Sequence, residues 1–184
     1  MTTSFNKKQQ SGIALVISLI MLLLLTIIGV TAMRVTGLEE KMAGNSKDQN
    51  VAFQAAEISL RDSEAWLDAQ VLEPTPVSNP SLPARVWTFN SMDPIQNSIS
   101  WWQEPTRDKT WWEGGATVQY GTAIPPVSTR PYSVIELKQY VSDTLLLGTA
   151  NAQAGLSYYQ VTARGTGGSD LSKVLLQSTI IRRY

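Results

Sequence analysis

The apolar positions of this chain are concentrated in one uninterrupted run near its start. Residues 13–33 read IALVISLIMLLLLTIIGVTAM and contain no charged side chain. At about 1.5 Å of rise per residue, a helix of this length measures about 31 Å, close to the roughly 30 Å hydrocarbon core of a bilayer. The run therefore predicts a helix that is able to cross a membrane.

A helical pattern continues behind this run, because residues 34–70 contain no proline and keep apolar residues at steps of three and four. We expect one helix that extends to about residues 71–73, since Pro74 and Pro76 cannot continue it. Such a stripe usually packs on the protein's own domain and less often binds a partner. It consists of Val35, Leu38, Met42, Ala52, Ala56, Leu60 and Leu67.

Short strand patterns follow a proline-rich connector, PTPVSNPSLP at residues 74–83. The strongest pair is separated by the turn-rich segment 165–170, whose glycines lack the lysine of a phosphate-binding loop. The expected strands are residues 86–89, 116–120, 132–141, 156–164 and 171–182. These patterns predict an α+β fold in which the long helix covers one face of a small antiparallel sheet.

Residues 1–12, MTTSFNKKQQSG, form a polar leader with two lysines, no acidic residue and a final glycine. A secretory signal peptide would have a shorter apolar core, although Val30, Thr31 and Ala32 imitate its cleavage site. A plain single-span anchor is compatible with the composition. The flanking lysines and arginines do not decide the orientation of the span.

The amino-acid composition excludes several classes of functional site. The chain has 15 basic and 15 acidic residues, so no excess of positive charge points to nucleic acid. It contains no histidine and no cysteine, which excludes imidazole general bases, thiol nucleophiles and cysteine-based zinc sites within the chain. The composition does not require a cofactor, and we expect a protein that is not an enzyme.

The leader resembles the class III leader of type IV prepilins, in which a glycine directly precedes the apolar helix. The resemblance implies cleavage by a prepilin peptidase between Gly12 and Ile13, followed by N-methylation of Ile13. It also implies a soluble domain on the periplasmic side of the inner membrane and, later, a place in an extracellular fibre.

Residues 9 to about 64 resemble the amino-terminal signature of PilX-type minor pilins, and two segments near the carboxyl end are similar to the end of that family. The resemblance implies the type IV pilin fold. The matching segments are Thr36–Asn45, Ala52–Glu57, Leu60–Asp62, Tyr159–Gly168 and Leu176–Thr179.

Two positions depart from the general pilin pattern. Most pilins have phenylalanine first in the mature chain and glutamate fifth, where this chain has Ile13 and Ile17. The family's glutamate is thought to pair with the amine of a neighbouring subunit, and a buried amine without a partner is costly. In related secretion pseudopilins the subunit that lacks this glutamate is the tip member, so Ile17 implies a place at or near the filament tip. The family's helix-breaking proline is also absent.

The six tryptophans lie between Trp66 and Trp112 and include two adjacent pairs, Trp101–Trp102 and Trp111–Trp112. They are expected mainly to supply buried area to a small domain. If the pairs lie on strands, one ring of each pair is partly exposed and is a candidate contact with another subunit. A sugar-binding platform is the less favoured interpretation.

The nearby carboxylates of Glu104, Asp108 and Glu113 are interpreted as solvated loop charges. Their spacing lacks the alternating pattern of a calcium-binding loop. A hydrolytic pair would require both carboxylates in one cleft.

The sequence hypothesis is a PilX-like minor pilin that takes part in initiating assembly of the type IV pilus, with roles in adhesion and twitching motility implied. Its predicted divisions are the leader 1–12, a transmembrane and assembly helix 13–33, a periplasmic half-helix 34–72 and a globular domain 73–184. The implied partners are membrane lipid, the major pilin, other minor pilins, a PilY-type tip adhesin and the prepilin peptidase. The alternatives are a tip pseudopilin of a type II secretion system and a membrane-anchored periplasmic sugar-binding or hydrolytic domain.

Overall fold

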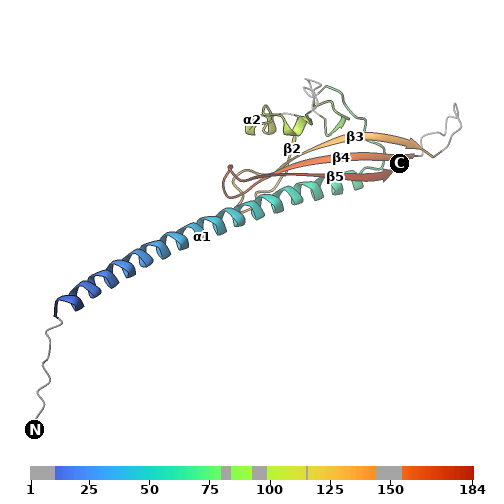
Figure 1. Cartoon of the computed structure of the whole chain (residues 1–184). Helices are drawn as coiled ribbons and strands as arrows, with labels where there is room; N and C mark the ends of the chain where they lie inside the picture. The colour runs from blue at the N-terminus through green and yellow to red at the C-terminus, as the bar shows by residue number, and fades with distance from the viewer. Residues whose placement is uncertain (1–10, 80–83, 93–98, 115, 144–154) are drawn as a thin grey trace, which may run out of the picture. The chain divides into compact units, whose positions relative to one another are not determined.

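The computed structural model describes residues 11–79, 84–92, 99–114, 116–143 and 155–184. The chain divides into two compact units, residues 1–45 and residues 46–184. The first unit contains the amino-terminal part of helix α1 (Ser11–Asp68), and the second contains the rest of α1 and all the strands (Figure 1). Most of the predicted leader, residues 1–10, lies outside the described residues.

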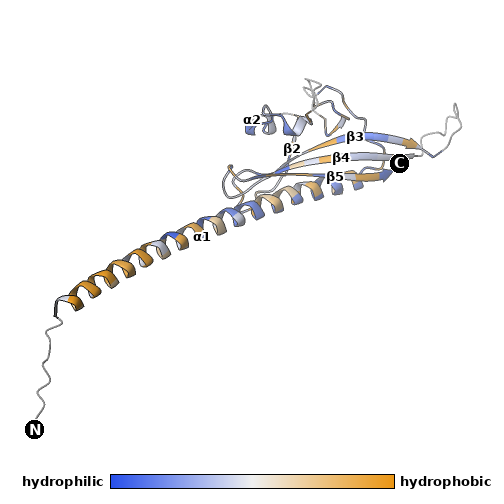
Figure 2. Ribbon diagram, in the orientation of Figure 1, coloured by the Kyte–Doolittle hydropathy of each residue, from blue (hydrophilic) through white to orange (hydrophobic). Residues whose placement is uncertain are grey.

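Over residues 13–33, α1 carries no charged side chain and is coloured almost entirely as hydrophobic (Figure 2). Its few hydroxyl groups bond to the helix's own carbonyls: Ser18 Oγ donates to Leu15 O over 2.8 Å, and Thr26 Oγ1 donates to Leu23 O over 2.7 Å. Backbone and side-chain polar groups are therefore satisfied within the helix, as a lipid environment requires. Among the described residues, α1 is the one helix whose length and composition suit a membrane crossing.

The helix ends at Asp68, earlier than the predicted residues 71–73. Gln70 causes the early stop: its backbone N–H donates to Leu67 O over 3.1 Å, and its side chain donates to Trp66 O over 3.0 Å. Arg182 holds the same end from the sheet, because its guanidinium donates to the Asp68 carbonyl and lies 2.8 Å from the Asp68 carboxylate. A local turn at Gln70 and a contact from β5 thus hold the end of α1 before the chain reaches its prolines.

Every expected strand is present, and the sheet has the order β1-β3-β4-β5, with β2 also paired to β3. Pairing is antiparallel throughout except between β1 and β3, where the expected antiparallel arrangement is replaced by a parallel one. The strands are β1 (Val86–Thr88), β2 (Val118–Gln119), β3 (Tyr132–Ser142), β4 (Gly155–Thr166) and β5 (Lys173–Arg183). The α+β fold with a long helix on a small, mostly antiparallel sheet is confirmed.

The carboxyl-terminal part of α1 covers one face of the sheet. Its small residues Ala52, Ala55 and Ala56 are buried, and Ser63 Oγ donates to Ser133 Oγ on β3 over 2.8 Å. The apolar cluster between helix and sheet contains Leu67, Val86, Ile135, Tyr159 and Val161. The later half of the predicted apolar stripe therefore packs on the protein's own domain.

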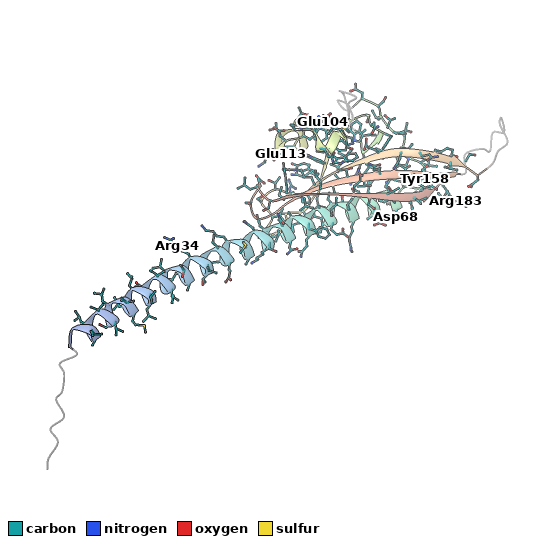
Figure 3. All side chains as sticks on the ribbon, in the orientation of Figure 1. Arg34, Asp68, Glu104, Glu113, Tyr158 and Arg183 are labelled. Carbon is teal, nitrogen blue, oxygen red and sulfur yellow. The ribbon has the colours of Figure 1, made fainter. Side chains whose placement is uncertain are left out.

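The opposite face of the sheet is covered by a third layer, formed by residues 89–92, 99–114 and 116–117, which contains η1 (Trp101–Gln103) and α2 (Lys109–Trp112). Neither helix was expected from the sequence. Figure 3 shows Glu104 and Glu113 on this side of the sheet and Asp68 on the α1 side. The second apolar cluster contains Trp87, Met92, Trp101, Trp112, Tyr132 and Val134. Because both faces are covered, the first five residues of β3 are all buried.

The approach of α1 to β4 depends on Gly165. A Cβ atom at this position would collide with the Ala52 carbonyl oxygen and the Ala56 amide nitrogen, which belong to the helix backbone. We expect Gly165→Ala to lower the free energy of unfolding by at least about 1–3 kcal/mol. The helix backbone cannot move aside in the way that a flexible side chain can.

Chemical unfolding of the detergent-solubilised chain, followed by circular dichroism, measures this effect. Gly121→Ala is the matched control, since a Cβ there meets nothing within 4 Å. Equal stability of the two variants would contradict the close approach of α1 and β4.

Candidate interaction surfaces

The described part of the first unit exposes apolar side chains on all sides. Ile13 is 67% exposed and Ile17 is 53% exposed, and the residues between them and Met33 are exposed as well. Val35, Leu38 and Met42, the early half of the predicted stripe, are also exposed. A surface this large and this apolar is not stable in water, so it needs lipid or other helices to cover it.

Glycines interrupt this apolar surface at Gly29, Gly37 and Gly44. A Cβ added at any of them would meet nothing within 4 Å, so the helix backbone is open to a neighbour there. Small residues permit close helix–helix approach in membranes, where packing replaces the hydrophobic effect as the driving force. The first unit therefore has the features of a helix that packs against other helices.

The predicted processing and assembly positions all lie at the start of α1. Gly12 and Ile13 occupy its first turn, and Ile17 follows one turn later. No carboxylate lies between residues 13 and 38 of the chain, so this segment offers nothing to neutralise an amine. Cleavage after Gly12, methylation of Ile13 and the missing pairing at Ile17 stay predictions.

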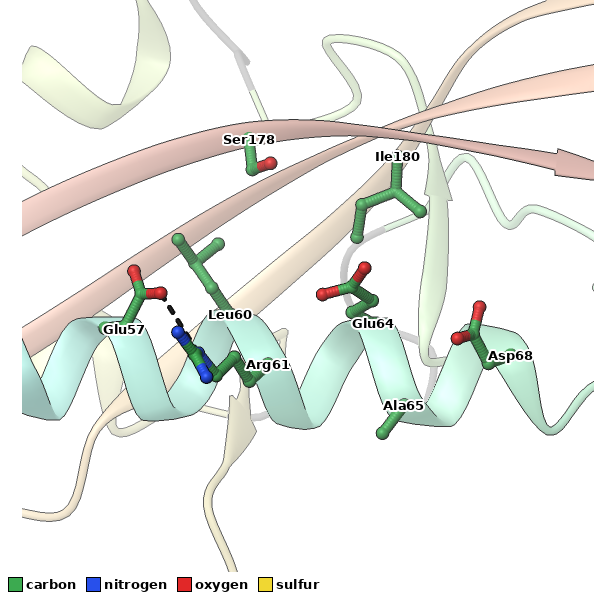
Figure 4. Close-up of a pocket in the computed structure, with 8 residues that line it drawn as sticks. All are labelled: Glu57, Leu60, Arg61, Glu64, Ala65, Asp68, Ser178 and Ile180. Carbon is green, nitrogen blue, oxygen red and sulfur yellow. Dashed lines mark hydrogen bonds and ion pairs between the residues drawn. The ribbon is translucent and has the colours of Figure 1, made fainter.

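In the second unit, a groove of about 480 Å³ runs between α1 and the edge strand β5 (Figure 4). Leu60 and Ile180 supply its apolar part, and an ion pair of 3.1 Å joins Arg61 to Glu57 on its helix side. The carboxylate of Glu64 has no ion-pair partner among the described residues. The full lining is Glu57, Leu60, Arg61, Glu64, Ala65, Asp68, Ser178 and Ile180.

The exposure of one ring in each tryptophan pair was predicted for pairs that lie on strands. Neither pair lies on a strand. Trp101 and Trp102 belong to η1, whereas Trp111 and Trp112 belong to α2. Within each pair the rings meet edge to face, with centroids 5.6 Å apart in the first pair and 5.2 Å apart in the second. This geometry is favourable for aromatic rings beyond the area that it buries.

One indole of each pair is buried and the other is half-buried. Trp101 and Trp112 are 1% exposed, and they form the centre of the third layer. Trp102 and Trp111 pack against this cluster while keeping part of their surface accessible. The guanidinium of Arg107 lies 4.6 Å from the centre of the Trp111 ring, a cation–π distance. Most of the tryptophan surface is therefore used for packing, as expected.

Glu136 is a buried charged residue that the sequence analysis did not identify. It lies on β3, fully buried, and its two carboxylate oxygens accept hydrogen bonds from Trp101 Nε1 and from the Asn90 backbone N–H, both over 3.0 Å. Asn90 adopts a left-handed φ of 59°. Burial raises the pKa of Glu136 to about 7, although both hydrogen bonds favour the charged form. This carboxyl group fastens the third layer to the sheet.

The three candidate acidic residues are engaged separately and form no shared cleft. Glu104 is buried, contrary to expectation, and pairs with Arg107 over 3.3 Å. Asp108 caps α2 by accepting from Trp111 N over 2.9 Å, and Glu113 lies 3.7 Å from Lys109. Within the described ranges, no group of three acidic side chains is arranged to hold a metal ion.

The glycine-rich segment between β4 and β5 is a turn, as predicted. Asp48 of α1 accepts from Gly168 N over 2.5 Å and from Ser169 Oγ over 2.8 Å. Hydrogen bonds, the largest from Ser172, lower the pKa of Asp48. The adjacent Asp170 lies 2.6 Å from Lys109 Nζ, a contact that holds the pKa of this carboxyl well below its usual range.

Two family models match the chain. PilX N-terminal matches residues 11–61, and Type IV pilus assembly protein PilX C-term matches residues 48–182. Together they extend from the first described residue of α1 almost to the end of β5. No curated protein and no solved structure matches the chain.

The buried Glu136 carboxyl should make stability depend on pH. The unfolded group loses its proton near pH 4.5, whereas the folded group keeps it up to about pH 7. The contribution of Glu136 to the free energy of unfolding is therefore fully present below about pH 4.5. It falls by about 3 kcal/mol as the pH rises to about 7, at roughly 1.4 kcal/mol per pH unit. Urea unfolding at pH 5 to 8 measures this change.

The absence of histidine and cysteine leaves no other side chain with an ordinary pKa in this range. Glu136→Gln should flatten the pH profile, whereas Glu64→Gln, on an exposed position, should leave it intact. A profile of equal slope in the wild-type chain and in Glu136→Gln would assign the effect to another group.

Proposed function

This chain belongs to the PilX family of type IV pilus minor pilins, and we propose that it takes part in initiating pilus assembly at or near the filament tip. The observation that carries this proposal is the amino-terminal part of α1, whose residues 13–33 carry no charge and expose apolar side chains on all sides. A helix of this kind suits two successive environments, the inner membrane and the core of a helical fibre.

The physical step in this role is transfer of α1 from lipid into a bundle of helices. Lipid tails are as apolar as leucine, so this transfer gains little from the hydrophobic effect and depends on close packing. The open backbone at Gly29, Gly37 and Gly44 favours such packing. The charged side chains of α1 begin at Arg34, so moving residues 13–33 between lipid and bundle transfers no side-chain charge, and the terminal amine at Ile13 is the one charge that must be accommodated.

The tip position is supported by Ile17. A subunit without the assembly glutamate cannot neutralise the terminal amine of a subunit placed above it. Only the terminal position has no such neighbour. An isoleucine at this point is thus compatible with the first subunit of a fibre and unfavourable for a subunit within its length.

The partners that we propose are the major pilin, other minor pilins, a PilY-type tip adhesin and the prepilin peptidase. Two surfaces of the second unit are the proposed contacts with the tip assembly. One is the groove between α1 and β5, where the Glu64 carboxylate forms no ion pair with a described residue. The other is the accessible edge of Trp102 and Trp111, next to the buried Trp101 and Trp112.

Processing is the first test of this role. We expect mass spectrometry of the chain from its host membrane to find an amino terminus at Ile13 that carries one methyl group. Gly12→Val should prevent cleavage and reduce the number of surface fibres to that of cells lacking the chain. Ser11→Ala is the control and should be processed normally. An intact leader in the wild-type chain, or normal fibre numbers without the chain, would refute the proposal.

Position in the fibre is the second test, and the absence of native cysteine makes it direct. Leu171 lies in the turn between β4 and β5 and is 93% exposed, so Leu171→Cys should react with a maleimide–gold label without disturbing the core. Electron microscopy should show the label at one end of a fibre. Label distributed along the fibres would contradict the tip position while leaving membership in the pilus intact.

A further inference from the structure

Strand β5 forms the outer edge of the sheet, because it pairs with β4 on one side and with no described strand on the other. At its end, Tyr184 N–H donates to Gly155 O and Gly155 N–H donates to Tyr184 O. In an antiparallel pair, residues that bond to the neighbouring strand alternate with residues whose backbone groups point away from it. The even-numbered residues of β5 therefore bond to β4. The residues whose N–H and C=O groups point outward are Lys173, Leu175, Gln177, Thr179, Ile181 and Arg183.

This edge lacks the features by which native proteins block unwanted strand pairing. Such features are a charge or a proline within the edge strand, a β-bulge, or a very short strand. Residues 174–181 read VLLQSTII, without charge or proline, and the register with β4 is unbroken from Leu156 to Thr166. At the other side of the sheet, β1 has only three residues, and Val77 bridges to it. The long, regular edge of β5 is therefore able to accept another strand.

The groove on the α1 side of this edge carries a negative charge. Glu57, Glu64 and Asp68 share one face of the helix, because they are spaced by seven and four residues. Glu57 pairs with Arg61, and Asp68 is neutralised from β5 by Arg182. Glu64 forms no ion pair with a described residue, and its side chain is directed from α1 toward the β5 side of the groove (Figure 4). One carboxylate charge thus remains uncompensated beside the edge.

The opposite face of the same edge is apolar. Ser178 and Ile180 line the groove, so the side chains of the odd-numbered residues of β5 project on the side away from α1. Among them Leu175 is 39% exposed and Ile181 is 53% exposed. A strand added to β5 would therefore meet a carboxylate on one of its faces and apolar side chains on the other.

We propose that the outer edge of β5 is completed by an extended strand of a partner protein in which basic and apolar residues alternate. The basic side chains face the groove and neutralise Glu64. The apolar side chains lie beside Leu175 and Ile181, and the backbone of the added strand pairs with the outward N–H and C=O groups of β5. This inference deepens the contact proposed for the groove, and it rests on that proposal only for the source of the partner.

A second copy of this chain is a less suitable occupant of the edge. The basic residues of β5 are at its two ends, and the strand contains no acidic residue. When two copies of β5 pair antiparallel along their full length, Lys173 of one copy lies opposite Arg183 of the other. Like charges that lie directly opposite each other are destabilising. The charge pattern therefore favours a different chain as the donor of the strand.

Binding is tested on the full chain in detergent. The probe is a fluorescein-labelled peptide of eight alternating lysine and valine residues, and the readout is fluorescence polarisation. We expect saturable binding that weakens as the ionic strength rises. A peptide with the same composition but with all lysines before all valines should bind about tenfold more weakly, because it cannot gather its lysines on one face. A peptide of alternating glutamate and valine should also bind about tenfold more weakly, because its charge is repelled by Glu64.

Absence of saturable binding by the lysine–valine peptide would overturn the proposal. Equal binding of the block peptide would show adsorption by charge alone, and equal binding of the glutamate peptide would show that the groove does not select basic residues. Either result would also overturn it.

Thr179→Pro tests the edge directly. The Thr179 N–H points outward, so a proline there removes no bond to β4, whereas its ring blocks an incoming strand. We expect this variant to keep the circular dichroism spectrum of the wild type and to bind the lysine–valine peptide about tenfold more weakly or worse. Thr179→Val is the matched control, because it retains the N–H, and it should bind normally. Unchanged binding by a folded Thr179→Pro variant would overturn the proposal.

Charge variants provide a test that does not depend on the folding of Thr179→Pro. Glu64 is exposed, so Glu64→Lys should leave the core intact and weaken peptide binding about tenfold. Glu39→Lys makes the same change at an exposed position of the first unit and should bind normally. Equal binding by these two variants would overturn the assignment to the groove.

Two further outcomes separate this inference from neighbouring explanations. A wild-type dimer in detergent that Thr179→Pro converts to a monomer would assign the edge to a second copy and overturn the proposal. Failure of the peptide to bind, together with normal processing and label at one fibre end, would overturn this inference alone and leave the proposed function in place.

Discussion

The rest of this structure depends on an apolar helix surface that its own chain leaves uncovered. Over residues 13–33 every apolar side chain is exposed. Water cannot accommodate such a surface, so the helix must exchange one apolar environment for another. In the proposed role, lipid covers this surface before assembly and neighbouring helices cover it afterwards.

In the second unit the constraint is different, because a small sheet must bury both of its faces with few apolar side chains. One face is covered by the same α1 helix, whose alanines and the facing Gly165 allow a close approach. The other face is covered by short, irregular segments that carry most of the tryptophans. Large aromatic rings provide buried area at a low cost in ordered residues, which suits a layer with only two short helices.

Polar groups inside this second unit determine how the layers are held together. Glu136 fastens the third layer through Trp101 and Asn90, and Ser63 joins α1 to Ser133 of β3. Buried polar groups that are paired in this way specify one arrangement of the layers.

The sequence by itself determined the elements whose signal is local. The sequence pattern identified α1 from its apolar run and its steps of three and four. It identified the five strands and the turn after β4 from alternation bounded by glycine and proline. The family resemblance came from short motifs, and Ile13 and Ile17 were identified as departures from the pilin pattern by their positions. What only the tertiary structure decided are relations between distant segments: the parallel pairing of β1 with β3, the end of α1 at Asp68, the burial of Glu104 and the role of Glu136. A buried glutamate on a strand looks like any other charged residue in the sequence, because its burial depends on a layer contributed from elsewhere in the chain.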